Sequence, residues 1–150
     1  MYQPSRSQTL PQADAARRER IVAGLAQPRL AASYPGPVMT LVLAIRLMAA
    51  AMRSGMDPVV ELSRRLHSLT AAKAVLDLAK ACSQAWPENV AVNRPCCHAL
   101  SPDEAVFADM AAACLACDRD AFAATLDGLV RRERHHGLYA ATTEAIGYLG

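Results

Sequence analysis

Residues 38–52 read VMTLVLAIRLMAAAM, and this run decides the fold that the sequence predicts. Apolar side chains recur along it at the spacing of one helix face. They are Val38, Leu41, Val42, Ile45, Met48, Ala49 and Met52. The run is shorter than the roughly 20 apolar residues that a membrane span needs, and Arg46 interrupts it near its middle. We therefore expect the central buried helix of a bundle and no membrane span.

Arg46 has two interpretations in such a helix. It could bind a carboxylate in a functional site. Alternatively, its aliphatic stem lies along the core while its charged head reaches water, as long basic side chains commonly do. The second interpretation is favoured.

The chain has 150 residues, enough for one domain with a sizeable core, and 53% of them are hydrophobic. Each periodic segment has the helical period, which predicts an all-α compact bundle of about five to seven helices. We expect a disordered N-terminal tail over residues 1–11 and a single helical domain over 12–150. An amphipathic helix over 14–26 would present Ile21, Val22 and Leu25 to that domain.

Two helices are expected after Gly55. Asp57 and Pro58 start the first, which runs to Leu66, and Thr70 caps the second, which spans 71–86. The pair resembles a bacterial helix-turn-helix over 58–80. The turn carries His67 where that motif commonly has glycine, and it is one residue longer than usual. The second helix offers few side chains suited to reading bases, so two packed helices are the favoured interpretation.

The C-terminal third begins with a capping box. Ser101 would cap a helix starting at Pro102, and Glu104 would return a hydrogen bond to the cap. Asp118 would cap a further helix whose last turn, 131–136, places cations at the negative end of the helix dipole. Gly137 would then stop that helix, and a final helix would follow from Leu138.

Four of the five cysteines lie near this capping box. Cys97, His98, Cys114 and Cys117 suggest a zinc site, but a straight helix carries Cys117 about 24 Å beyond Ser101, out of reach of Cys97. Cys82, Cys114 and Cys117 fall on apolar helix stripes and are expected to be packed. The candidate thiol or metal-binding residues are therefore Cys96, Cys97 and His98, in a loop before a helix start, with zinc or another thiophilic metal as the ion.

The segment from Leu41 to Ala51, the Pro95-Cys96-Cys97 sequence and the capped Leu100–Glu104 segment together resemble a family of small uncharacterised bacterial all-helical proteins. In that family a cysteine pair precedes a similar helix cap. The resemblance implies an all-helical domain and puts Cys96 and Cys97 at its centre. It implies no activity.

The sequence contains no phosphate-binding glycine loop, no nucleophile elbow and no acid–base pair at helical spacing. We therefore predict no catalytic and no cofactor-binding residues, and expect a non-enzymatic interaction or regulatory module. The alternative is a thiol-based metal or redox sensor using Cys96 and Cys97, and the third hypothesis is DNA binding through 58–80. Another protein or a second copy is the expected partner. A net charge of +2 argues against nucleic acid, and cysteines without a secretory leader indicate a reducing cytoplasmic location.

Overall fold

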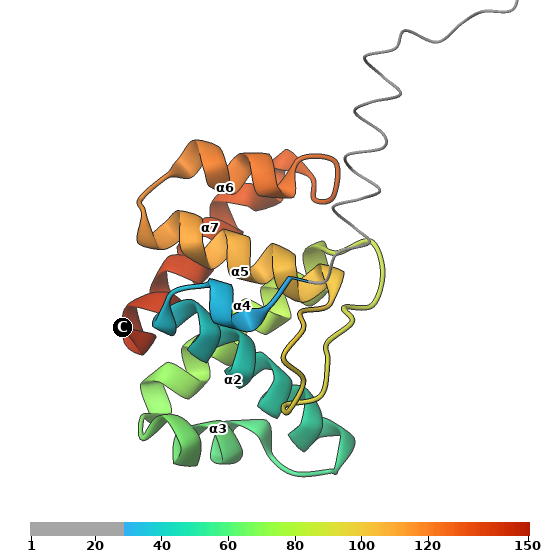
Figure 1. Ribbon diagram of the computed structural model, residues 1–150, viewed down its shortest axis with the longest axis vertical. Helices are drawn as coiled ribbons and strands as arrows, with labels where there is room; N and C mark the ends of the chain where they lie inside the picture. Colours follow the sequence, from blue (N-terminus) through green and yellow to red (C-terminus); the bar gives the residue numbers. More distant parts are fainter. Residues whose placement is uncertain (1–28) are drawn as a thin grey trace, which may run out of the picture.

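The computed structural model describes residues 29–150, and six α-helices and one short 3-10 helix make up 71% of these residues (Figure 1). They are η1 (Ala31–Ser33), α2 (Gly36–Arg53), α3 (Pro58–Leu66), α4 (Leu69–Ala85), α5 (Pro102–Leu115), α6 (Arg119–Leu126) and α7 (Arg132–Leu149). No β-strand occurs between residues 29 and 150, so the predicted all-α class is confirmed. The expectations for residues 1–11 and 14–26 lie outside the described residues.

α2 is the central helix, as predicted, and it packs against α3, α4, α5 and α7 (Figure 1). Pro35 and Pro37 fix its start, and the buried side includes Leu41, Ile45 and Met48. By length and hydropathy α2 could also cross a membrane, and in the bundle 44% of it is buried. Its buried side contributes to one continuous hydrophobic core that includes residues of the other five α-helices.

The start of α4 lies two residues before the predicted one. Ser68, not Thr70, is the N-cap, and its hydroxyl accepts a hydrogen bond from the Ala71 amide at 3.1 Å. The turn before it is correspondingly short, because His67 adopts a left-handed conformation with φ of 53°. In contrast, Asp57 caps α3 as expected, through a hydrogen bond from the Val59 amide.

The capping box predicted at Ser101 is present. The Ser101 hydroxyl accepts a hydrogen bond from the Glu104 amide at 3.1 Å, and the Glu104 carboxylate accepts one from the Ser101 amide at 2.8 Å. The helix that it opens, α5, buries Phe107, Met110 and Cys114 between α2, α6 and α7.

The predicted boundary between the last two helices is wrong. α6 ends at Leu126, and the chain turns at Gly128, whose φ is 79°. α7 then starts at Arg132 and runs through Gly137 without a break. The cationic run therefore lies at the N-terminal end of a helix, and the dipole interpretation of His135 and His136 is wrong. One ring nitrogen of His135 instead lies 3.0 Å from the Val130 carbonyl oxygen, in the turn before α7.

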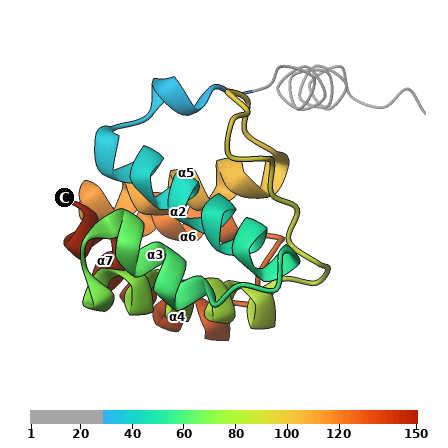
Figure 2. The same ribbon diagram turned by 90° about the horizontal axis from the view of Figure 1, so that it is seen from below.

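A long loop, residues 86–101, connects α4 to α5 and runs beside α2 to the beginning of the described chain (Figure 2). There Leu30 pairs with Ala99 in an isolated antiparallel bridge. The Ala31 amide donates to the His98 carbonyl at 3.0 Å, and the Leu100 amide donates to the Arg29 carbonyl at 2.7 Å. The entering chain and the loop therefore hold each other in place.

Candidate functional site

A buried ion pair joins Arg46 of α2 to Glu104 of α5, and both side chains also form hydrogen bonds to the 86–101 loop. The exposed fraction is 3% for Arg46 and 0% for Glu104. Arg46 Nε lies 2.7 Å from one carboxylate oxygen, and one terminal nitrogen lies 2.9 Å from the other. This two-point geometry matches the planar fork of the guanidinium to the carboxylate.

The remaining hydrogen-bonding capacity of the pair is used to hold the 86–101 loop. Arg46 donates to the Cys97 carbonyl at 2.5 Å and to the Ala99 carbonyl at 2.8 Å. Glu104 accepts from the amides of Asn93 and Ser101, both at 2.8 Å. In residues 29–150 no buried side-chain nitrogen or oxygen lacks a partner, so this network is fully satisfied.

The charged state of Glu104 follows from these contacts. Burial alone would raise its pKa, but the hydrogen bonds from Arg46, Ser101 and Asn93 and the positive charge of Arg46 outweigh burial and lower it. The hydrogen bond to Glu104 likewise raises the pKa of Arg46. Both groups are therefore charged at neutral pH, and neither is a free acid or base for catalysis.

A second carboxylate on α5 fixes the first part of the same loop. Asp103 accepts a hydrogen bond from the Ala91 amide at 2.7 Å and from the Trp86 indole at 3.3 Å. The Ser101 hydroxyl donates to the Ala91 carbonyl at 2.6 Å. Through Asp103, Glu104 and Arg46, the loop is bound to the helices along most of its length.

The favoured interpretation of Arg46, with its head in water, is therefore wrong. The guanidinium group of Arg46 can be buried because the Glu104 carboxylate and two backbone carbonyl groups accept its hydrogen bonds. Sequence reasoning assigned Glu104 only to the capping box and missed its second role. One signal in the sequence could have indicated the pair: a single arginine lies within an otherwise apolar helix, and a glutamate lies in the first turn of a second, largely apolar helix.

The candidate residues Cys96, Cys97 and His98 lie on a groove of about 700 Å³. Its other walls are the first half of α2 and the segment around η1. Three large apolar side chains on these walls are substantially exposed: Leu30 at 53%, Met39 at 37% and Leu43 at 44%. Cys96 is exposed and Cys97 is half-buried. We call this feature the cysteine-loop groove.

The other three cysteines divide differently from the prediction. Cys82 and Cys114 are buried, as expected, and burial raises the pKa of the Cys82 thiol to about 12 and also raises that of Cys114. Cys117 is exposed and lies beyond the end of α5, in a left-handed turn with φ of 53°. The expectation that Cys117 is packed on the helix stripe is therefore wrong, because α5 ends two residues earlier.

Among residues 29–150, no three His, Cys, Asp or Glu side chains come together as a metal site. The structure thus does not bring Cys97 and His98 together with Cys114 and Cys117. Cys96, Cys97 and His98 share one loop and one groove, and they remain the candidate thiol site.

The α3 and α4 pair presents a narrow exposed stripe on α4 that includes Lys73, Asp77 and Lys80. The left-handed His67 takes the conformation that glycine usually provides in a helix-turn-helix. The opposite side of α4 packs against α2, α3 and α7. An acidic residue between two lysines gives this stripe little attraction for phosphates, and we assign no site to it.

Comparison with protein-family models, curated proteins and solved structures found no match to this chain. The resemblance to the bacterial family with a cysteine pair stays a prediction.

Proposed function

We propose that this protein is a non-enzymatic interaction module that binds the apolar side of a partner helix in the cysteine-loop groove. The observation that carries the proposal is the gathering of Leu30, Met39 and Leu43 on one groove, where each is more than one-third exposed. Met39 and Leu43 are four residues apart on α2, so they lie on the same side of the helix. Exposed apolar side chains gathered in this way are typical of a protein-binding surface.

The chemistry of the groove supports an apolar partner. Among residues 29–150, Arg46 is the only Arg, Lys, Asp or Glu that lines the groove, and Glu104 already neutralises it. A charged side chain of a partner would therefore lose its hydration without finding a counter-ion. An amphipathic helix meets the requirement because it presents apolar residues at positions i, i+3, i+4 and i+7.

The groove is also held in shape before any partner arrives. Its loop wall is fixed by the Arg46 hydrogen bonds to the carbonyls of Cys97 and Ala99. The segment opposite is fixed by Asp109 of α5, which accepts hydrogen bonds from Arg29 at 2.6 Å and Tyr34 at 2.7 Å. A preformed surface binds with less loss of conformational entropy.

The test uses a fluorescein-labelled model helix with leucine on one side and glutamine and lysine on the other. Fluorescence anisotropy should show saturable binding to the wild-type protein. Leu43→Asp should weaken binding by about tenfold or more, because it replaces a side chain worth roughly 1.5–3 kcal/mol on burial with a charge. Val60→Asp is the matched control, since Val60 is 54% exposed but lies on α3.

Equal binding by Leu43→Asp and Val60→Asp, or no binding to any of the proteins, would reject the groove as the binding surface. Sedimentation at increasing protein concentration tests whether a second copy of the chain occupies the groove. If the wild type associates with itself and Leu43→Asp does not, the partner helix belongs to a second copy of the chain.

A thiol-based metal or redox sensor is the second candidate, favoured because an exposed Cys96 and a half-buried Cys97 adjoin on the same groove. Cysteine and histidine are ligand types that zinc prefers, but among residues 29–150 Cys96, Cys97 and His98 do not form a three-ligand site, so a metal held there would need a further ligand from elsewhere. Such a sensor requires the reduced thiols of the cytoplasmic location that we propose. Metal analysis after purification under reducing conditions tests it: a wild-type protein that retains metal and a Cys96→Ser variant that loses it would support sensing, and a metal-free wild type would reject metal sensing.

A further inference from the structure

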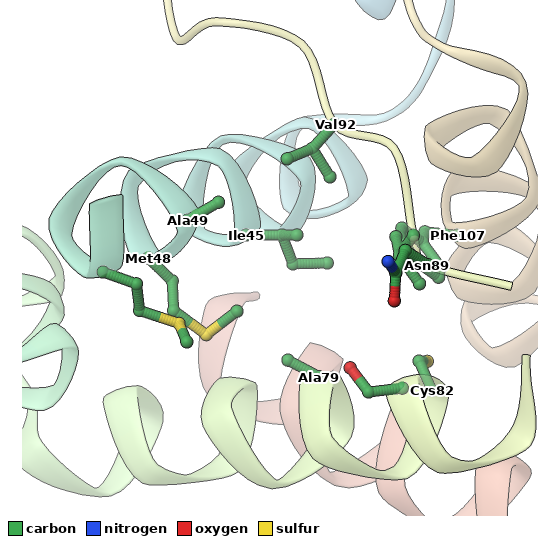
Figure 3. A pocket seen from close by; sticks show the side chains of 11 residues that line it. Ile45, Met48, Ala49, Ala79, Cys82, Asn89, Val92 and Phe107 are labelled. Atoms are coloured by element: carbon green, nitrogen blue, oxygen red, sulfur yellow. The ribbon is translucent and has the colours of Figure 1, made fainter.

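A second hollow, of about 330 Å³, lies between α2, α4 and the 86–101 loop (Figure 3). Ile45 and Met48 of α2 point toward Ala79 and Cys82 of α4 across this space. Phe107 of α5 closes one end of it. We call this feature the α2–α4 pocket. No residue between 29 and 150 lines both this pocket and the cysteine-loop groove.

The pocket has an apolar floor and a polar rim. Ile45, Met48, Cys82 and Phe107 are each less than one-tenth exposed. Ser83 and Asn89 are exposed, and Asn89 reaches the pocket from the 86–101 loop (Figure 3). A molecule with an apolar body and one hydrogen-bonding group would match this arrangement, with the body on the floor and the polar group at the rim.

In the part of the chain that the structure describes, no Asp, Glu, Lys, Arg or His lines the pocket. A charged ligand would give up water without gaining a counter-ion, so the ligand must be neutral. A ligand in this space would add dispersion contacts to the apolar floor. The flexible thioethers of Met48 and Met52 can adjust to the shape of such a ligand.

We propose that the α2–α4 pocket binds a small neutral amphipathic molecule, an unbranched apolar chain or a single ring that carries one hydroxyl or carbonyl group. Its volume lies at the lower end of the range for small-molecule sites, which limits the ligand to a small one. Burial raises the pKa of the Cys82 thiol on the floor to about 12, so this thiol is a poor nucleophile at neutral pH and the proposed binding is non-covalent. The site is a function beyond the proposed helix binding and does not depend on it.

The chain reports on this pocket directly. Trp86 is the single tryptophan of the chain. Its ring lies 5.2 Å, centroid to centroid, from that of Phe107, which lines the pocket. The probe is 1-octanol, which is neutral, has one hydroxyl group and does not absorb where tryptophan does. Titration of the full chain with 1-octanol should change Trp86 fluorescence in a saturable way.

Ala79→Leu should reduce the affinity for 1-octanol by at least tenfold, because the larger side chain fills the pocket. Ala49→Leu should do the same from the α2 wall, which keeps the test valid if one variant does not fold. Ala124→Leu, on the exposed side of α6, is the matched control and should bind as the wild type does. Octanoate and octylammonium should each bind at least tenfold more weakly than 1-octanol.

The absence of a saturable fluorescence change in the wild type would overturn the proposal, as would unchanged affinity in both folded pocket variants. Equal affinity for the charged analogues would overturn the ligand chemistry. The Leu43→Asp variant separates this proposal from the proposed function. It should bind the model helix more weakly than the wild type does and bind 1-octanol with unchanged affinity.

Discussion

The replacement Arg46→Met tests whether the buried ion pair holds the loop and the bundle together. Methionine keeps the apolar stem but leaves the Glu104 carboxylate with only its two backbone amide donors, Asn93 and Ser101. It also removes the donor to the Cys97 carbonyl, whereas the Ala99 carbonyl keeps the Asn93 side-chain amide at 2.8 Å. Removing one partner of a buried ion pair costs about 3–5 kcal/mol of unfolding free energy.

Urea unfolding followed by circular dichroism measures this cost. A loss of that size lowers the urea midpoint by about 2 M for a domain with an ordinary dependence on denaturant. Arg53→Met is the matched control on the same helix, because Arg53 is exposed, and it should stay within about 0.5 kcal/mol of the wild type.

A double-mutant cycle with Glu104→Gln isolates the pairwise interaction. The double variant should be more stable than the sum of the single effects predicts, by about 2 kcal/mol, because it leaves no unpaired buried charge. Additive effects, or an Arg46→Met variant as stable as Arg53→Met, would refute the reasoning.

The stability of Arg46→Met should depend on pH differently from that of the wild type. In the wild type the pKa of Glu104 is lowered in the folded state, so its contribution is present above the ordinary value of 4.5 and is lost as pH falls through the lowered value. Without Arg46, burial raises the pKa of Glu104 and the carboxyl group takes up a proton at a higher pH. The stability difference between the wild type and Arg46→Met should therefore shrink between neutral pH and about pH 4.

Two further predictions concern the cap and the thiols. Ser101→Ala should destabilise the protein by about 0.5–2 kcal/mol because the helix cap is lost. The effect should lie toward the upper end of this range because the hydroxyl also donates a hydrogen bond to the Ala91 carbonyl. Thermal unfolding would show it as a lower midpoint. Limited alkylation of the native reduced protein, read by peptide mass spectrometry, should label Cys96 and Cys117 first and leave Cys82 and Cys114 unlabelled until unfolding; early labelling of Cys82 would mean that the core is not packed as described.

Local signals in the sequence predicted most of the fold. The apolar run around Leu41 gave the central helix, and the Ser101 capping box gave the start of α5, because both depend on residues close together in the chain. The last two helices were divided wrongly because the cationic residues before Gly137 matched the pattern of a helix C-terminus. In the structure the chain turns at Gly128, and Gly137 lies inside α7.

The site was harder to predict for a physical reason. Arg46 and Glu104 are 58 residues apart, and nothing in either local sequence specifies the other as its partner. The position of Cys117 depends on where α5 ends, and a shift of one or two residues moves a side chain from the core to the surface. The cysteine pair was placed in a loop correctly, whereas the groove beside it exists only because η1 and α2 meet that loop.

Thiol protection by the model helix tests the central claim, binding in the cysteine-loop groove, most directly. Cys96 and Cys97 line the groove, and Cys117 is an exposed thiol outside it that serves as an internal control. If the helix binds there, a saturating amount should slow alkylation of Cys96 and Cys97 and leave the rate at Cys117 unchanged. Saturating peptide that slows Cys117 equally, or that leaves Cys96 and Cys97 at their free rates, would contradict it.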